Sequence, residues 1–249
     1  MHRFFLPRDC FTRSGVTVAG QLVHRLRNVL RLGAGDCVVF LDNSGWEYEV
    51  ELGQMSGSKL EGTIISKAPA AGEPQTGITL YQALLKGGNF ESVLQKCTEV
   101  GVTGYVPIIC ERCVAAEPTG SRLGRWQSVI VEAAQQSRRG KLPVLHNVAQ
   151  FKEACRSAAG LSLLPWEGEK VRGIGTVLAG LPKTENISEV AIFVGPEGGF
   201  SPGEVNYARS CGIEPVSLGS RILRAETAGL VTATVILYEF GELRGDSQI

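Results

Sequence analysis

A cluster of charged and polar side chains near the C-terminal end of the chain has the composition of a chemical site. Arg221, Arg224, Glu226 and Thr227 lie within seven residues, directly after a glycine turn at residues 219–220. Guanidinium groups stabilise negative charge, and a carboxylate can accept a proton from a bound group. This density of polar groups indicates that residues 219–227 form part of a functional site.

Two strand-like runs, at residues 190–194 and 215–218, position this cluster. Each ends in a glycine turn: the first reads Gly-Pro-Glu-Gly-Gly at residues 195–199, and the second lies at 219–220. Turns with few side chains leave backbone N–H and C=O groups free, as in the pockets at the carboxyl ends of strands in α/β sheets. The alternative is that both are ordinary tight connections between a strand and a helix.

Strands and helices alternate from residue 78 onward. We expect strands at residues 78–84, 105–109, 161–164, 190–194 and 215–218, and helices at 89–100, 122–137, 151–159, 173–178, 202–210 and 225–240. Strands separated by helices predict an α/β fold with a mostly parallel sheet and helices on both faces. The last helix is apolar nearly all round, so it must be buried in a core or against another subunit.

Residues 1–70 have the pattern of a small β-rich domain instead. Short strands are expected at residues 16–18, 37–41, 46–52 and 60–66, with one helix at 21–30. Several short strands with one helix suggest a small barrel. The following stretch is rich in Pro, Gly and small residues, so we place a linker at 71–77 and a second domain at 78–249.

Composition excludes several classes of protein. The 249 residues are 43% hydrophobic and 20% charged, with no apolar run of membrane-spanning length and no signal pattern, so we expect a cytoplasmic protein without a membrane partner. The seven cysteines are scattered, and the Cys110/Cys113 pair lacks two further zinc ligands, so no metal is expected. Phosphate-binding fingerprints and a serine–histidine–aspartate triad are also missing, which removes most kinase and hydrolase interpretations.

Positive charge is concentrated in two places although the net charge is zero. Residues 1–31 hold six arginines against one aspartate, a balance of +5, and residues 120–141 hold five basic residues against one glutamate, a balance of +4. Such patches are typical of surfaces that bind a polyanion. Two solvated helix faces are the alternative.

Motifs along essentially the whole chain resemble one family. They read VLRLGAG at residues 29–35, EVG at 99–101, ERC at 111–113, EAAQQSR at 132–138, GPEGGFS at 195–201 and LGSRILRAETA at 218–228, together with His24, Lys86 and Lys96. This set is similar to the bacterial ribosomal small-subunit (16S) RNA methyltransferases that make N3-methyluridine, within the SPOUT superfamily. The last two motifs are specific in combination. Family members commonly have Glu-Leu-Gly where this chain has Glu-Val-Gly at 99–101, which conserves the shape.

The resemblance implies a PUA-like RNA-binding β-barrel, followed by a SPOUT-type α/β domain whose C-terminal segment forms a trefoil knot. Periodicity cannot indicate a knot, because true knots are nearly absent from proteins. The resemblance also implies a homodimer, 16S ribosomal RNA (within the 30S subunit) as the partner, and S-adenosylmethionine as the methyl donor. The donor would contact Leu164, Gly195, Pro196, Glu197, Gly198, Gly199, Leu218, Gly219, Ile222 and Leu223. For Leu164, a plain core position is the alternative.

The implied reaction suggests roles for the polar cluster. Uracil N3 must lose its proton before it can attack a methyl carbon, so we expect Arg221 or Arg224 to hold the charge of the uracilate. Glu226 or Glu197 would take the proton, although a simple ion pair between Arg224 and Glu226 is an alternative. RNA contacts are expected from Arg3, Arg25, Arg31, Lys86, Arg112, Arg138 and Arg139.

Two other functions remain open at this point. The first is a related knotted enzyme that methylates another base or a ribose hydroxyl. The second is a non-catalytic RNA-binding protein of ribosome assembly that uses the same barrel and basic patches.

Overall fold

The computed structural model describes residues 1–181 and 187–244, so the last five residues of the predicted second domain lie outside the described residues. The chain separates into two compact units. The first contains Met1–Glu73 together with Ala134–Leu142, and the second contains Pro74–Ala133 and Pro143–Ile249. The short segment 134–142 thus belongs to a unit that is distant from it in sequence.

The first unit is built on a five-stranded sheet with the order β1-β3-β4-β5-β2. The β1/β3 pair is parallel and the other pairs are antiparallel. Alternate residues of the strands, such as Val16 and Val18 or Val50 and Leu52, face a core to which Leu26 also contributes. The elements are β1 (Arg3–Phe5), η1 (Arg8–Cys10), β2 (Gly15–Ala19), α1 (Gln21–His24), the π-helical η2 (Arg25–Val29), β3 (Cys37–Leu41), β4 (Trp46–Ser56) and β5 (Lys59–Pro69).

The second unit contains a parallel sheet with the order β12-β10-β11-β6-β7-β8, and β9 also pairs with β7. The first strand of this sheet, β6, has β7 on one side and β11 on the other, so the strand order reverses there. The strands are β6 (Gly77–Ala83), β7 (Gly104–Ile109), β8 (Val144–Leu145), β9 (Ala149–Gln150), β10 (Leu161–Pro165), β11 (Glu189–Val194) and β12 (Glu214–Val216). The helices are α2 (Asn89–Val100), α3 (Gly120–Gln136), α4 (Phe151–Ser157), α5 (Ile174–Ala179), α6 (Pro202–Ser210) and α7 (Ala225–Glu239).

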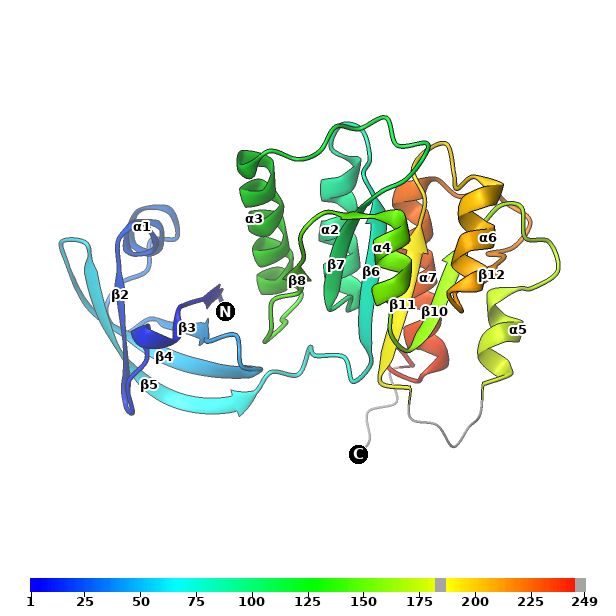
Figure 1. Ribbon diagram of the computed structural model, residues 1–249. Coiled ribbons are helices and arrows are strands. Elements are labelled where there is room, and N and C mark those ends of the chain that lie inside the picture. Colours follow the sequence, from blue (N-terminus) through cyan, green and yellow to red (C-terminus); the bar gives the residue numbers. More distant parts are fainter. Residues whose placement is uncertain (182–186, 245–249) are drawn as a thin grey trace. The chain divides into compact units, whose positions relative to one another are not determined.

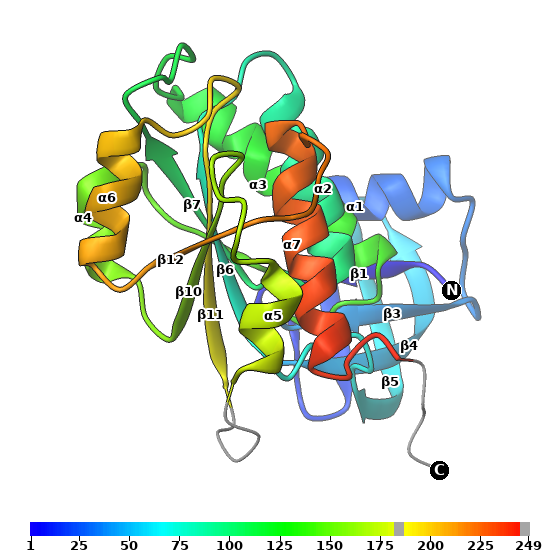
Figure 2. The same ribbon diagram turned by 90° about the vertical axis from the view of Figure 1, so that its right-hand side faces the viewer.

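Helices cover both faces of this sheet (Figures 1 and 2). The α4 and α6 helices lie on one face, and α2, α5 and α7 lie on the other, where α7 contacts α2, α5, β6 and β11. The α3 helix packs on α2 through Trp126, whose ring stacks on Phe90 at 4.1 Å between centroids. The α7 helix buries Ala233, Ile236 and Leu237. The apolar last helix therefore lies in the core of its own unit.

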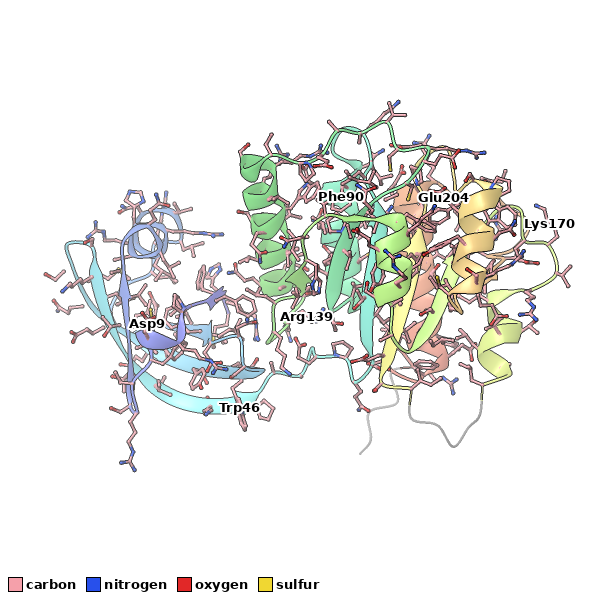
Figure 3. The ribbon with its side chains drawn as sticks, in the orientation of Figure 1. Asp9, Trp46, Phe90, Arg139, Lys170 and Glu204 are labelled. Atoms are coloured by element: carbon pink, nitrogen blue, oxygen red, sulfur yellow. The ribbon has the colours of Figure 1, made fainter. Side chains whose placement is uncertain are left out.

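The predicted α/β fold with a parallel sheet is confirmed. The expected strand at 215–218 is β12, which ends at Val216, and the very short β1, β8 and β9 were not predicted because two or three residues carry no periodicity. Trp46, labelled in Figure 3, is 41% exposed. The Lys67 ammonium lies 4.7 Å from its ring centroid. Within the part of the chain that the structure describes, every helix is too short or too polar to cross a bilayer.

Candidate active site

A cavity of about 550 Å³ opens at the carboxyl ends of three neighbouring strands of the second unit. Its walls are formed by residues 165–170 after β10, residues 194–200 after β11 and residues 217–228 after β12, with Asn89 at the start of α2. Both glycine turns therefore border one cavity. This position is where open α/β sheets bind ligands.

The turn after β11 folds back closely on itself. A Cβ atom on Gly195 would lie 3.1 Å from the backbone nitrogen of Phe200, which is too close for most side chains. Gly199 has a φ of 66°, a conformation that favours glycine, and its N–H donates to the carbonyl of Pro196 at 2.9 Å. Glycine at these two positions leaves a wall made largely of main chain.

A buried carboxylate fixes the far end of this turn. Ser201 and Glu204 form a capping box at the start of α6: the Ser201 Oγ accepts the N–H of Glu204 at 3.2 Å, and Glu204 accepts the N–H of Ser201 at 2.8 Å. The Glu204 carboxylate, at the N-terminal end of α6 in Figure 3, also accepts the N–H of Glu111 at 2.8 Å. In return, the Ser201 hydroxyl donates to the Glu111 carboxylate at 2.6 Å. The loop after β7 is thereby attached to the turn after β11.

Two predicted site residues, Arg112 and Glu197, form further hydrogen bonds that hold the turn after β11. The Arg112 guanidinium donates to the carbonyl of Gly198 at 2.9 Å. The Glu197 carboxylate accepts the N–H of Lys86 at 2.9 Å. The loops that follow β6, β7 and β11 are therefore joined by hydrogen bonds, and in this structure both side chains hold the cavity wall in place.

The segment after β12 is enclosed on both edges. The N–H of Trp166, at the end of β10, donates to the carbonyl of Val216 at 3.0 Å. On the other edge, the N–H of Ser217 donates to the carbonyl of Arg172 at 2.7 Å, and the N–H of Ile174 donates to the carbonyl of Ser217 at 3.0 Å. The loop 166–173 therefore passes around the end of β12. Gly219 follows with a φ of 103° and with open space where a Cβ would lie.

All three predicted catalytic residues line the cavity. Arg224 lies 3.7 Å from Glu226 as an ion pair, and their side chains are 85% and 20% exposed. An ion pair this long and open to solvent contributes little to stability. Arg221 is also exposed. The arginine head groups therefore lie at the open side of the cavity, and Glu226 lies deeper.

Nine of the ten residues predicted to bind the cofactor line the same cavity: Gly195, Pro196, Glu197, Gly198, Gly199, Leu218, Gly219, Ile222 and Leu223. Ile222 is 84% exposed. Leu164 does not line the cavity: it is fully buried in the core, among side chains such as Phe193 and Val205. Its prediction is therefore corrected to the core alternative, and the cavity wall begins one residue later, at Pro165.

Sequence reasoning placed a wall at the end of the β10 strand but missed the loop residues that follow it. Trp166, Glu167, Glu169 and Lys170 all line the cavity, and Lys170 can be seen on this loop in Figure 3. The N–H groups of Val171 and Arg172 donate to Glu169 and lower the pKa of its carboxyl group. The available signal was positional, because residues 166–170 directly follow a strand adjacent to β11.

The residues predicted to contact RNA differ in their environment. Arg25, Arg31, Lys86 and Arg138 are exposed. Arg3 is largely buried at 12% side-chain exposure and pairs with Glu47 at 2.6 Å.

Arg139 requires a correction, because it is 2% exposed and its guanidinium pairs with Glu73 at 2.9 Å. Glu73 also accepts the N–H groups of Gly140 and Lys141. Because the charge is buried and neutralised, Arg139 stabilises the segment 134–142 within its own unit and does not present a cation to RNA.

The Cys110/Cys113 pair lies in the turn that carries Glu111 and Arg112. Hydrogen bonding from the Cys110 side chain and backbone lowers the pKa of Cys113 to about 7, and the Cys110 N–H lies 3.3 Å from its sulfur. The hydrogen bond with the Cys113 side chain and burial both raise the pKa of Cys110. Over residues 1–181 and 187–244, no group of three or more His, Cys, Asp or Glu side chains is arranged to hold a metal ion.

Comparison with known proteins defines the class. An RNA methyltransferase domain matches residues 72–237. The ribosomal RNA small subunit methyltransferase E of Synechocystis is 32% identical over 94% of this chain and 77% of its own length. This chain therefore belongs to the ribosomal RNA small subunit methyltransferase E family of RNA methyltransferases, and the sequence-based assignment to this family is confirmed.

Solved structures agree over nearly the whole chain. The ribosomal RNA small subunit methyltransferase E of Neisseria gonorrhoeae, solved bound to S-adenosylmethionine, has 29% identity and a TM-score of 0.85, and the match covers 96% of this chain and 97% of that one. A Legionella pneumophila structure in complex with the same cofactor has 26% identity and a TM-score of 0.84, with 96% and 97% coverage.

Proposed function

We propose that this enzyme transfers a methyl group from S-adenosylmethionine to N3 of a uridine in 16S ribosomal RNA. The observation that carries the proposal is the single cavity, which brings together both glycine turns with Arg221, Arg224 and Glu226. Its relatives are named as small-subunit ribosomal RNA methyltransferases, and one was solved with this donor.

The cavity fits such a donor. The two glycine turns offer main-chain groups, and a side chain at Gly219 would project into free space beside the cavity. Leu218, Leu223 and Phe200 supply apolar surface for an adenine ring. The donor supplies an electrophilic methyl group on a sulfonium cation. The main chain of the turns would hold its nucleoside.

Proton removal from uracil N3 is the step that this chain's own side chains must support. The N3 lone pair belongs to the conjugated ring, so N3 becomes nucleophilic only as the anion. Arg221 and Arg224 would stabilise the negative charge that spreads over the O2 and O4 atoms of uracil. Glu226 is only 20% exposed and lines the same cavity, so it would accept the proton directly or through water.

Access to the base requires RNA binding outside the cavity. A uridine in folded RNA must turn out of its stack to reach a bound donor. We assign the phosphate contacts that position it to the exposed cations Arg25, Arg31, Lys86 and Arg138. The β-rich first unit would act as a PUA-like barrel, and 16S RNA within the 30S subunit would be the partner.

The finer architecture belongs to the same proposal. The hydrogen bonds on both edges of residues 216–217, with the loop 166–173 passing around them, support a trefoil knot. The partly buried apolar side chains Leu230, Val231 and Val235 on α7 support a homodimer. A cytoplasmic location follows from the ribosomal substrate.

Nucleoside mass spectrometry tests the proposed reaction. The protein is incubated with S-adenosylmethionine and either undermethylated 30S subunits or free 16S RNA, and the RNA is digested. We expect N3-methyluridine to appear and to depend on the donor. A signal only in 2′-O-methylnucleosides or another base would reject the specificity. Donor binding without any methylated product would favour a non-catalytic assembly protein.

A further inference from the structure

Glu167 has an unusual position in the wall that follows β10. It lines the cavity and is exposed, and its carboxylate approaches the glycine turn after β11 closely. A Cβ on Gly199 would lie only 2.6 Å from the Glu167 Oε1 atom. Glycine at this position therefore also makes room for the Glu167 carboxylate.

The other three carboxylates that line the cavity all have partners. Glu169 accepts two backbone N–H groups and pairs with Arg209 at 3.2 Å. Glu197 accepts the N–H of Lys86, and Glu226 pairs with Arg224. In contrast, Glu167 has no hydrogen bond or ion pair to any residue in the described part of the chain. Its two oxygens can accept hydrogen bonds from a ligand.

We propose that Glu167 binds the ribose of the methyl donor by accepting hydrogen bonds from its two vicinal hydroxyl groups. The inference rests on the proposed donor and adds a residue that recognises it by hydrogen bonding. Two carboxylate oxygens match two adjacent O–H donors, as acidic residues beside α/β strand ends do for other nucleotides. Glu167 lies against the main-chain turn that suits the nucleoside, whereas Arg221 and Arg224, which we assign to the RNA base, come from the wall after β12.

Isothermal titration calorimetry with three ligands tests this assignment. S-adenosylmethionine and S-adenosylhomocysteine carry the amino-acid group, whereas 5′-methylthioadenosine has only the ribose, the base and a neutral sulfur. In Glu167→Gln we expect all three to bind about tenfold more weakly than in the wild type, because charge-assisted hydrogen bonds to the common ribose are lost. Glu153→Gln removes the same charge from the exposed surface of α4 and should change none of the affinities.

A ligand lacking one hydroxyl separates contact from indirect structural effects. Removing the 2′-hydroxyl from methylthioadenosine should weaken binding about tenfold in the wild type and about twofold or less in Glu167→Gln. Equal losses in both proteins would overturn the proposal, as would a loss confined to S-adenosylmethionine and S-adenosylhomocysteine. An unchanged affinity in Glu167→Gln would overturn this inference alone. If the wild-type protein binds no ligand, the proposed donor fails with it.

Discussion

The two glycine turns that border the cavity are held in different ways. The turn after β11 is fixed at several points: Glu204 and Glu111 hold Ser201, Arg112 holds Gly198, and Glu197 is attached to the loop after β6. Beyond Ser217, the segment after β12 has few such contacts. Among the described residues, the Ser217 hydroxyl forms hydrogen bonds only with Gly219. Ile222 is 84% exposed, and the ion pair between Arg224 and Glu226 is long.

This difference suggests a division of labour. A wall fixed by several hydrogen bonds does not have to reorganise when it binds a donor, so its affinity does not include a cost for ordering the turn. Charged side chains on an open segment can meet a substrate that enters from solvent. The first turn would therefore supply the fixed part of the donor site, and the second would carry, besides its own donor contacts, the charged groups that act on the RNA base.

We expect the largest effect from removing the Glu204 carboxylate, which accepts two backbone N–H groups and holds the turn after β11. Glu204→Ala leaves the N–H groups of Glu111 and Ser201 without their acceptor at a buried position. We expect a loss of about 3 kcal/mol in the free energy of unfolding, measured by urea unfolding. Glu153→Ala on the exposed surface of α4 is the control. A loss below about 1 kcal/mol would mean that the hydrogen bonds to Glu204 are not important for stability.

Substitutions in the exposed segment after β12 should change the catalytic rate and leave the stability of the fold unchanged. Arg224→Ala removes an 85% exposed side chain, so the fold should be unaffected. We expect the turnover number to fall about a hundredfold through lost charge stabilisation, with the dissociation constant of the donor unchanged within about twofold. Arg156→Ala, on exposed α4, should change neither quantity. Equal losses in turnover and donor affinity would assign Arg224 a structural role.

The turn that carries Glu111 and Arg112 can be probed through its cysteines. Because hydrogen bonding lowers the pKa of Cys113 to about 7, its reactive thiolate should form as the pH rises through about 7. Burial raises the pKa of Cys10 above its ordinary value, so Cys10 provides an internal control that reacts only at higher pH. Iodoacetamide labelling followed by peptide mass spectrometry measures both. A shared midpoint would contradict the hydrogen-bonded arrangement of Cys113.

We expect the smallest effect from removing the exposed hydrogen bond between Arg112 and the carbonyl of Gly198. Arg112→Ala removes one hydrogen bond to the carbonyl of Gly198, which water can replace. We expect about 1 kcal/mol or less in the free energy of unfolding and a two- to threefold weaker donor affinity, measured by calorimetry. A large loss of RNA affinity with unchanged donor affinity would return Arg112 to the phosphate-binding role that the sequence predicts.

Neighbouring arginines illustrate what pattern reasoning cannot separate. Arg138 is the last residue of the motif at 132–138 and Arg139 follows it directly, and both were predicted to contact RNA. Arg138 is exposed, whereas Arg139 is buried against Glu73, 66 residues away in sequence. The fold of the first unit determines which of the two guanidinium groups stays in water. Leu164 and Pro165 differ in the same way, because the cavity begins between them.

By itself, the sequence determined the alternation of strands and helices, the two glycine turns and the polar cluster of residues 221–227. These features depend on contacts within a few residues, such as the capping box of Ser201 and Glu204. Only the tertiary structure decided that three loops share one cavity, that the Glu111 N–H donates to Glu204, and that Glu167 faces Gly199 without a hydrogen-bond partner among the described residues. Such contacts join residues tens of positions apart, and their distances are set by how the strands of the sheet are ordered and packed.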